Sequence, residues 1–110
     1  MPNFQVLKGH TSDVNWVDFT GTKLLVSCSN DKTVRLWEAD DDGKFQETSL
    51  SPLTGHSYGV NRVRFSPFGT IIASCSTDGN IILWNTHVSQ SVNCQSRLKL
   101  SNASDSNFSV

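Results

Sequence analysis

Two copies of one pattern make up most of the chain, and this repetition constrains the fold more than any other feature. Gly9-His10 recurs as Gly55-His56, 46 residues later. After one extra residue in the turn Ser66–Gly69, the spacing becomes 47, and Val34-Arg35-Leu36-Trp37 is matched by Ile81-Ile82-Leu83-Trp84. One insertion in a turn explains the whole change of spacing, so the two copies are duplicates of one structural unit.

The residue pattern within each unit predicts a series of short β-strands. β-Branched and aromatic residues gather in runs that are bounded by Gly, Asn, Asp and Ser, which is the pattern of strands joined by tight turns. The expected strands are Phe4–Leu7, Val14–Phe19, Leu24–Ser29, Thr33–Trp37, Phe45–Leu50, Val60–Phe65, Thr70–Ser76, Asn80–Trp84 and Arg97–Leu100. Asp78-Gly79 suits a turn with positive φ. No helical periodicity extends beyond a turn or two, so we expect an all-β chain.

The opening Gly-His, the closing Trp and the period near 45 resemble the WD-repeat β-propeller family. The signature Trp-Asp is replaced by Trp37-Glu38 and Trp84-Asn85, although in that family the second residue varies. The resemblance implies two four-stranded antiparallel blades of an incomplete β-propeller. Residues 1–8 are then expected to form the outer strand of a neighbouring blade, 9–50 the first repeat, 51–100 the second repeat and 101–110 a disordered Ser/Asn-rich tail.

The same resemblance implies that four residues in each blade share one hydrogen-bond network. These structural tetrads are His10, Ser27, Asp31 and Trp37 in the first blade, and His56, Ser74, Asp78 and Trp84 in the second. The chemistry is consistent, because a hydroxyl can accept from a buried indole N–H while it donates to an imidazole nitrogen. The other imidazole nitrogen then donates to a carboxylate, so every buried polar group has a partner.

A set of His, Ser and Asp also raises the possibility of acyl-transfer catalysis. Both serines lie in the middle of predicted strands, however, and the chain has no Gly-x-Ser-x-Gly elbow to expose a nucleophile. We therefore expect no enzyme activity, no catalytic residue and no cofactor. Cys28 and Cys75 occupy matching positions and lack the paired spacing of a zinc site, so we predict two small buried strand residues and no metal site.

The resemblance implies a protein-interaction module whose loops form a rigid top surface for a protein or peptide partner. The implied partner-binding residues are Asp13, Asn15, Asn30, Tyr58, Gly59, Asn61 and Thr77. Tyr58 is the best aromatic anchor, since tyrosine is favoured at binding hot spots. The alternative for each residue is an ordinary solvated loop position. Trp16 is expected to pack between the blades.

Charge and hydropathy exclude two classes of partner. Nine Lys and Arg against ten Asp and Glu give a net charge of −1, which offers no electrostatic surface for direct nucleic-acid binding. No run approaches the roughly 18 apolar residues of a membrane span. The first ten residues also lack the apolar core of a secretory signal, so we expect an intracellular protein, cytoplasmic or nuclear, with free thiols.

Two blades do not close a propeller, which typically has 4–8. We expect either part of a longer protein, a truncated product or splice isoform, or a subunit that needs further blades from other chains to complete the ring. The strings Phe65-Ser66-Pro67 and Ile72–Gly79 are similar to the N-terminal propeller of the WD-repeat, sterile-alpha-motif and U-box proteins. That similarity implies an alternative function, as the substrate-recruiting part of a U-box-type ubiquitin ligase whose catalytic domain is absent from this chain.

Overall fold

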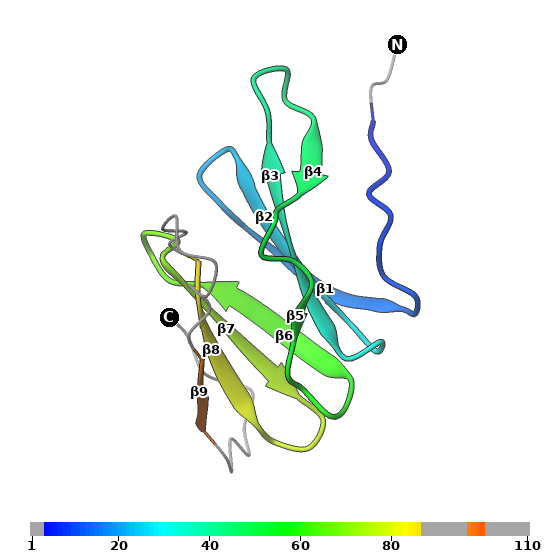
Figure 1. Ribbon diagram of the computed structural model, residues 1–110, viewed down its shortest axis with the longest axis vertical. Helices are drawn as coiled ribbons and strands as arrows, with labels where there is room; N and C mark the ends of the chain where they lie inside the picture. The colour runs from blue at the N-terminus through cyan, green and yellow to red at the C-terminus, as the bar shows by residue number, and fades with distance from the viewer. Residues whose placement is uncertain (1–3, 87–96, 101–110) are drawn as a thin grey trace.

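A computed structural model describes residues 4–86 and the backbone of residues 97–100, which form two antiparallel β-sheets (Figure 1). The first sheet contains β1 (Val14–Thr20), β2 (Leu24–Ser29), β3 (Thr33–Ala39), β4 (Phe45–Glu47) and β5 (Leu53–Thr54). The second contains β6 (Val60–Phe65), β7 (Ile71–Ser76), β8 (Ile81–Asn85) and β9 (Arg97–Leu100). No helix occurs in this part of the chain. The prediction of an all-β chain with two antiparallel blades is confirmed.

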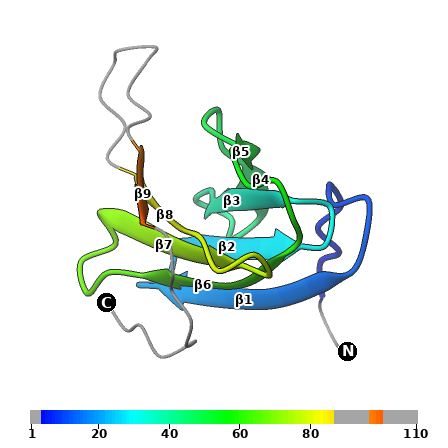
Figure 2. The same ribbon diagram turned by 90° about the horizontal axis from the view of Figure 1, so that it is seen from below.

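The two sheets repeat each other in register as well as in sequence. Val17 pairs with Ser27 between β1 and β2, and the equivalent Val63 pairs with Ser74 between β6 and β7. Each of these strand pairs also shifts register near its start, at Val14 in β1 and at the matching position in β6. Figure 2 shows β1 and β6 together at one edge of the layers, with β4, β5 and β9 at the other. The duplicated sequence therefore builds two duplicated blades.

The tight turn before the third strand of each blade has the same shape. Gly79 adopts φ 84°, as the Asp-Gly pair predicts, and the equivalent Lys32 adopts φ 76°. A lysine in this left-handed region is strained. In the first blade the carboxylate of Asp31 accepts from the Thr33 amide at 2.9 Å, which holds the turn closed around Lys32.

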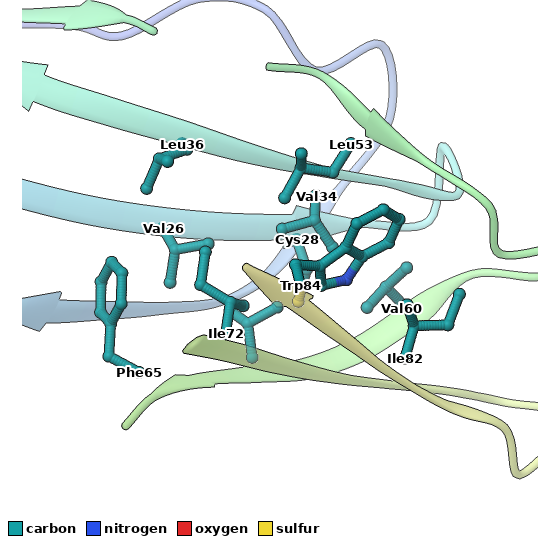
Figure 3. Packing of buried hydrophobic residues seen from close by; sticks show 11 residues of the cluster. Val26, Cys28, Val34, Leu36, Leu53, Val60, Phe65, Ile72, Ile82 and Trp84 are labelled. Atoms are coloured by element: carbon teal, nitrogen blue, oxygen red, sulfur yellow. The ribbon is translucent and has the colours of Figure 1, made fainter. Parts of the chain in front are cut away.

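The core lies between the two sheets, which pack face to face (Figure 3). The first sheet contributes aliphatic side chains from β2 and β3, including Val26 and Leu36. The second contributes larger ones, including Phe65, Ile72 and Trp84. Burial of each such side chain stabilises the fold by roughly 1.5–3 kcal/mol, so this interface is the main source of stability.

The expected strand over Phe4–Leu7 is not formed. Instead, the Gln5 side chain donates to Phe45 O at 2.9 Å and accepts from Phe45 N at 3.0 Å. The Gln5 amide thus takes up the backbone N–H and C=O of Phe45 that a pairing strand would use. Its side chain also separates the main chain of residues 4–7 from that of β4, so the two do not pair as strands. Residues 1–3 and the expected disordered tail, 101–110, lie outside the described residues.

The first sheet extends beyond the expected boundary between residues 50 and 51. β4 ends at Glu47, earlier than predicted, and pairs with β3 only from Trp37 to Ala39. β4 therefore leaves the start of β3 unpaired on this edge, and β5 pairs with it there, with Leu53 opposite Val34. Its pairing with β3 places this segment in the first sheet rather than in the second, and Leu53 joins the core. The prediction of an outer strand at Arg97–Leu100 is confirmed by β9, which pairs with β8.

Candidate functional site

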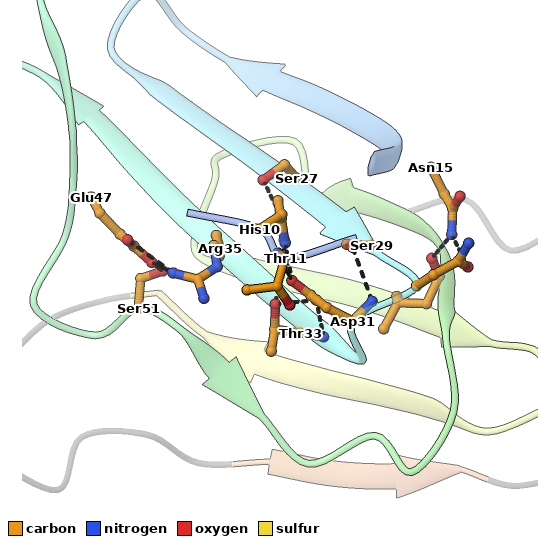
Figure 4. A network of polar contacts seen from close by, with 12 residues as sticks. His10, Thr11, Asn15, Ser27, Ser29, Asp31, Thr33, Arg35, Glu47 and Ser51 are labelled. Carbon is orange, nitrogen blue, oxygen red and sulfur yellow. Dashed lines mark hydrogen bonds and ion pairs between the residues drawn. The ribbon is translucent and has the colours of Figure 1, made fainter. Parts of the chain in front are cut away.

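In the first blade the structure brings His10, Ser27, Asp31 and Trp37 into one chain of contacts, of which Figure 4 shows the first three residues. Trp37 Nε1 donates to Ser27 Oγ at 3.0 Å, and His10 Nε2 lies 2.8 Å from the same oxygen. His10 Nδ1 lies 2.9 Å from Asp31 Oδ2. Because an ionised carboxylate can only accept, the proton of the imidazole belongs on Nδ1, and Nε2 accepts from the Ser27 hydroxyl. This chain ties the loop before β1 to β2 and β3.

The Asp31 carboxylate is hydrogen-bonded on both of its oxygens. Burial would raise the pKa of Asp31, but hydrogen bonds from Thr33, from the Thr11 amide and from His10 together hold that pKa well below its usual value. The four contacts measure 2.6–3.0 Å. The side chain is 5% exposed, so the charge is shielded and fully hydrogen-bonded.

The second blade brings together three of its four predicted residues in the same way. Trp84 Nε1 donates to Ser74 Oγ at 2.9 Å, and His56 Nε2 lies 2.7 Å from that oxygen. Asp78 differs from Asp31, because it is exposed and accepts from the amide and side chain of Asn80 within its own turn. The Ser76 hydroxyl lowers the pKa of Asp78 most, burial opposes it, and Asn80 and the nearby His56 lower it further.

Loops at the end of the blades where His10 and His56 lie bring the predicted partner-binding residues together. In the first blade Asn30 N donates to Asp13 O, and in the second Thr77 N donates to Gly59 O, both at 3.0 Å. These two backbone bonds are equivalent through the repeat. Each closes the loop before the first strand against the turn before the third, which fixes four of the seven predicted residues on rigid turns.

Asn15 and Gly59 join the two loop clusters across the blade boundary. Asn15 Nδ2 donates to Asn30 Oδ1 at 2.9 Å and to Val60 O at 2.8 Å. A side chain on Gly59 would place its Cβ 2.9 Å from Asn30 Oδ1, so the close approach of the blades requires glycine there. Asn15, predicted as a partner contact, is thus engaged within the fold.

The remaining predicted contacts are exposed. Tyr58 is 54% exposed, and Asn61 lies on the exposed side of β6. Trp16, expected to pack between the blades, does contact the second blade: Arg62 stacks on its indole with Cζ 4.4 Å from the ring centroid, while the residue stays 39% exposed. Trp16 lies in β1, and Arg62 lies at the equivalent position of β6 in the second repeat. Their cation–π contact therefore joins the first strands of the two blades.

Sequence reasoning did not identify a second polar cluster in the first blade. Arg35 Nη1 donates to both oxygens of Glu47, at 2.9 and 3.1 Å, and the Ser51 hydroxyl donates to the same carboxylate. Leu36 N donates in turn to Ser51 Oγ. The signal was present in the repeat, because Arg35 stands where the second blade has Ile82, and a charge at a strand position of that kind needs a partner.

The described side chains offer little for catalysis. Ser27 and Ser74 are buried and receive an indole N–H, so neither is placed to attack a substrate. Burial raises the pKa of the Cys28 thiol to about 12 and raises that of Cys75, which keeps both protonated. Within residues 4–86, no three His, Cys, Asp or Glu side chains gather to hold a metal ion. The same residues contain no helix long and apolar enough to cross a membrane.

Comparison with known proteins agrees with the fold. The family model described as WD domain, G-beta repeat (WD40) matches residues 2–38 and 47–85. WD repeat, SAM and U-box domain-containing protein 1 of Homo sapiens is 49% identical over 84 residues, which are 76% of this chain and 17% of that protein. The protein of the same name from Danio rerio is 44% identical over 79 residues, 72% of this chain and 15% of that protein.

A second group of relatives has a different name. Nuclear distribution protein nudF of Aspergillus flavus is 37% identical over 84 residues, 74% of this chain and 18% of that protein. The chain thus spans less than a fifth of the length of each of these three relatives. Two repeat matches, two blades in equivalent register and two His–Ser–Trp contacts lead to the same assignment: the chain belongs to the WD40 (WD domain, G-beta repeat) family.

Proposed function

We propose that the chain is a non-enzymatic module that binds a protein or peptide partner, as part of a larger propeller assembly. One observation carries the proposal. The loop clusters of the two blades are held together as one surface by the Asn15 side chain, which reaches Val60 O at 2.8 Å. Asp13 and Asn30 of the first blade and Tyr58, Asn61 and Thr77 of the second are exposed on this surface, so a partner lying across both blades would contact residues of each. Rigid turns keep the entropic cost of such binding low.

The proposed binding surface combines one large aromatic side chain with neutral polar groups and the carboxylate of Asp13. Tyr58 supplies apolar area and a hydroxyl, and Asn61 and Thr77 supply donors and acceptors around it. Such a surface suits a peptide or loop whose backbone N–H and C=O groups are free to bond.

We propose an intracellular location, in the cytoplasm or nucleus. The two described cysteines are both free thiols, which is typical of these reducing compartments.

Site-specific photocrosslinking tests the surface directly. A photoreactive phenylalanine analogue replaces Tyr58 in one version of the full chain and Phe68 in a control version. Phe68 is 92% exposed in the turn between β6 and β7, outside the proposed surface. We expect covalent adducts with a defined set of proteins from position 58 that position 68 does not give. Identical adducts from both positions, or none from position 58, would contradict the proposal.

An alternative within the same surface is substrate recruitment for a U-box-type ubiquitin ligase. The support is the similarity to relatives whose names contain the U-box, of which this chain matches 15–17%. If this alternative holds, the chain by itself binds the same substrate as a longer U-box ligase and competes with that ligase for it. Excess chain in cells should then raise the steady-state level of the proteins captured at position 58, whereas a simple scaffold leaves that level unchanged.

A further inference from the structure

The tight turn between β2 and β3 holds a lysine in a conformation that glycine adopts in the other blade. Lys32 has φ 76°, and in the described part of the chain it is the one residue other than glycine with a positive φ. Its repeat equivalent, Gly79, has φ 84°. A side chain is unfavourable in this left-handed region, and glycine avoids that cost. The presence of a lysine here therefore needs an explanation outside the backbone.

The turn closes in the same way with and without a side chain at this position. Lys32 N donates to Ser29 O at 3.2 Å in the first blade. Gly79 N donates to Ser76 O at 3.0 Å in the second. Both bonds use backbone groups that glycine supplies as well as lysine does. The side chain of Lys32 is thus dispensable for the shape of the turn.

The ammonium group of Lys32 has no counter-ion among residues 4–86. The ion pairs of this part of the chain use other side chains, and they are His10–Asp31, Lys23–Asp41 and Arg35–Glu47. The carboxylate next to Lys32 in the sequence, that of Asp31, already accepts four hydrogen bonds from other groups. Lys32 is exposed, so its positive charge is open to a bound molecule.

Lys32 shares its turn with a residue of the proposed binding surface. That residue is Asn30, whose amide donates to Asp13 O at 3.0 Å. Asp13 adds a carboxylate in the loop before β1, and no ion pair joins it to Lys32 in the described structure. In the equivalent turn of the second blade, Gly79 carries no charge, and the carboxylate of Asp78 beside it is exposed. The two turns therefore present opposite charges to a partner that lies across both blades.

We infer that Lys32 is a specificity-determining residue of the loop surface, and that the partner places an anionic side chain against it. The inference rests on the proposed partner-binding function and adds the chemistry of the partner. The carboxylate of Asp or Glu and a phosphorylated side chain both supply the negative charge. Charges at the rim of an interface act mainly on the choice and orientation of the partner. This role explains a charged side chain in a turn where the second blade has glycine.

A peptide array tests the charge preference. The purified full chain is incubated with an array of random peptides that contains phosphoserine as well as the ordinary amino acids. Peptides bound by the wild type should be enriched in Asp and Glu or in phosphoserine, and the more enriched type identifies the source of the charge. Lys32→Gln should lower binding to these peptides about fivefold, the factor that corresponds to an ion pair of about 1 kcal/mol.

Two further variants control for net charge and for charge type. Lys23→Gln removes the same charge from the turn between β1 and β2, outside the loop surface, and should leave binding unchanged. Lys32→Arg keeps the positive charge and should retain the preference for anionic peptides. Bound peptides with no excess of acidic or phosphorylated residues, or equal binding by wild type and Lys32→Gln, would overturn this inference and leave the partner-binding function in place.

Stability separates a role in binding from a role in the fold. Lys32→Gly should unfold at a urea midpoint no lower than that of the wild type, because the turn needs no side chain, and should lose the preference for anionic peptides. A marked fall in that midpoint would show that the lysine serves the fold, and would overturn the inference. A wild-type chain that binds no peptide on the array would overturn it too, and photocrosslinking at position 58 then decides the partner-binding function by itself.

Discussion

Replacing Asp31 by asparagine is the sharpest test of the first-blade network. The Asp31 carboxylate accepts four hydrogen bonds, two on each oxygen: from His10 and the Thr11 amide on Oδ2, and from the amide and hydroxyl of Thr33 on Oδ1. Asparagine keeps one acceptor and turns the other into an NH₂ donor. The Thr33 hydroxyl can turn to accept, but the Thr11 and Thr33 amides can only donate, so at least one of these backbone N–H groups faces a donor whichever way the amide points.

The expected cost follows from that backbone donor. A hydrogen bond to a charged group contributes about 1.5–3 kcal/mol, so the loss of one destabilises the chain by that amount. The assay is urea unfolding followed by tryptophan fluorescence, with the midpoint converted through the m-value. Asp41→Asn is the matched control, because the Asp41 side chain is fully exposed and lies 3.8 Å from Lys23.

The pH dependence gives the same experiment a second readout. The folded state lowers the pKa of Asp31, so its stabilising contribution is complete above the unfolded value of about 3.9. That contribution is lost as the pH falls below this value toward the folded pKa. The difference between wild type and Asp31→Asn should therefore be largest at neutral pH and shrink below about pH 4. Equal midpoints for Asp31→Asn and Asp41→Asn at pH 7 would refute the reasoning.

Three further outcomes follow from the structure. Trp37→Phe and Trp84→Phe each remove the indole donor to a buried serine and should destabilise the chain by roughly 1–3 kcal/mol in the same urea assay; midpoints equal to that of wild type would count against the network. Asn15→Ala removes the contacts to Asn30 and Val60 and should cost about 1–2 kcal/mol, whereas Asn61→Ala, at the equivalent exposed position, should cost less; the reverse order would contradict the assignment of Asn15 to the blade contact. Cys28, with a pKa of about 12 because burial disfavours its thiolate, should resist alkylation at pH 8 until urea unfolds the chain; peptide mapping by mass spectrometry checks this, and rapid labelling of the native chain would show that the site is open.

The strands were largely predictable because the repeat fixes them twice. Leu24–Ser29 and Val60–Phe65 form strands over the predicted ranges, and each has a counterpart at constant spacing. The prediction failed where pairing depends on a distant edge rather than on local pattern. β5 forms because β4 leaves the start of β3 open, and no feature of Leu53-Thr54 alone indicates this. Phe4–Leu7 has strand-like residues, yet a side chain, Gln5, meets β4 in place of the backbone.

The candidate site was predictable to the extent that its residues repeat. The family resemblance, applied at matching positions of the two repeats, selects His, Ser and Trp in both blades, and the structure places those three in contact twice. Spacing could not distinguish Asp31, which is shielded and bonds across to His10, from Asp78, which is exposed and bonds to Asn80 in its own turn. Nor could it reveal that Asn15 is committed to the fold, because its partner is a backbone carbonyl in the other blade.

The strand β1 carries a consequence for how the chain comes apart. Its Asn15 side chain donates to Val60 O, and Asp18 Oδ2 accepts from Phe65 N, so polar groups of this strand are bonded to both ends of β6. Peeling β1 from its own sheet must also release backbone groups of the neighbouring one. The amide hydrogens of β1, β2 and β6 should therefore exchange with solvent as one cooperative group, at a rate set by the separation of the two layers.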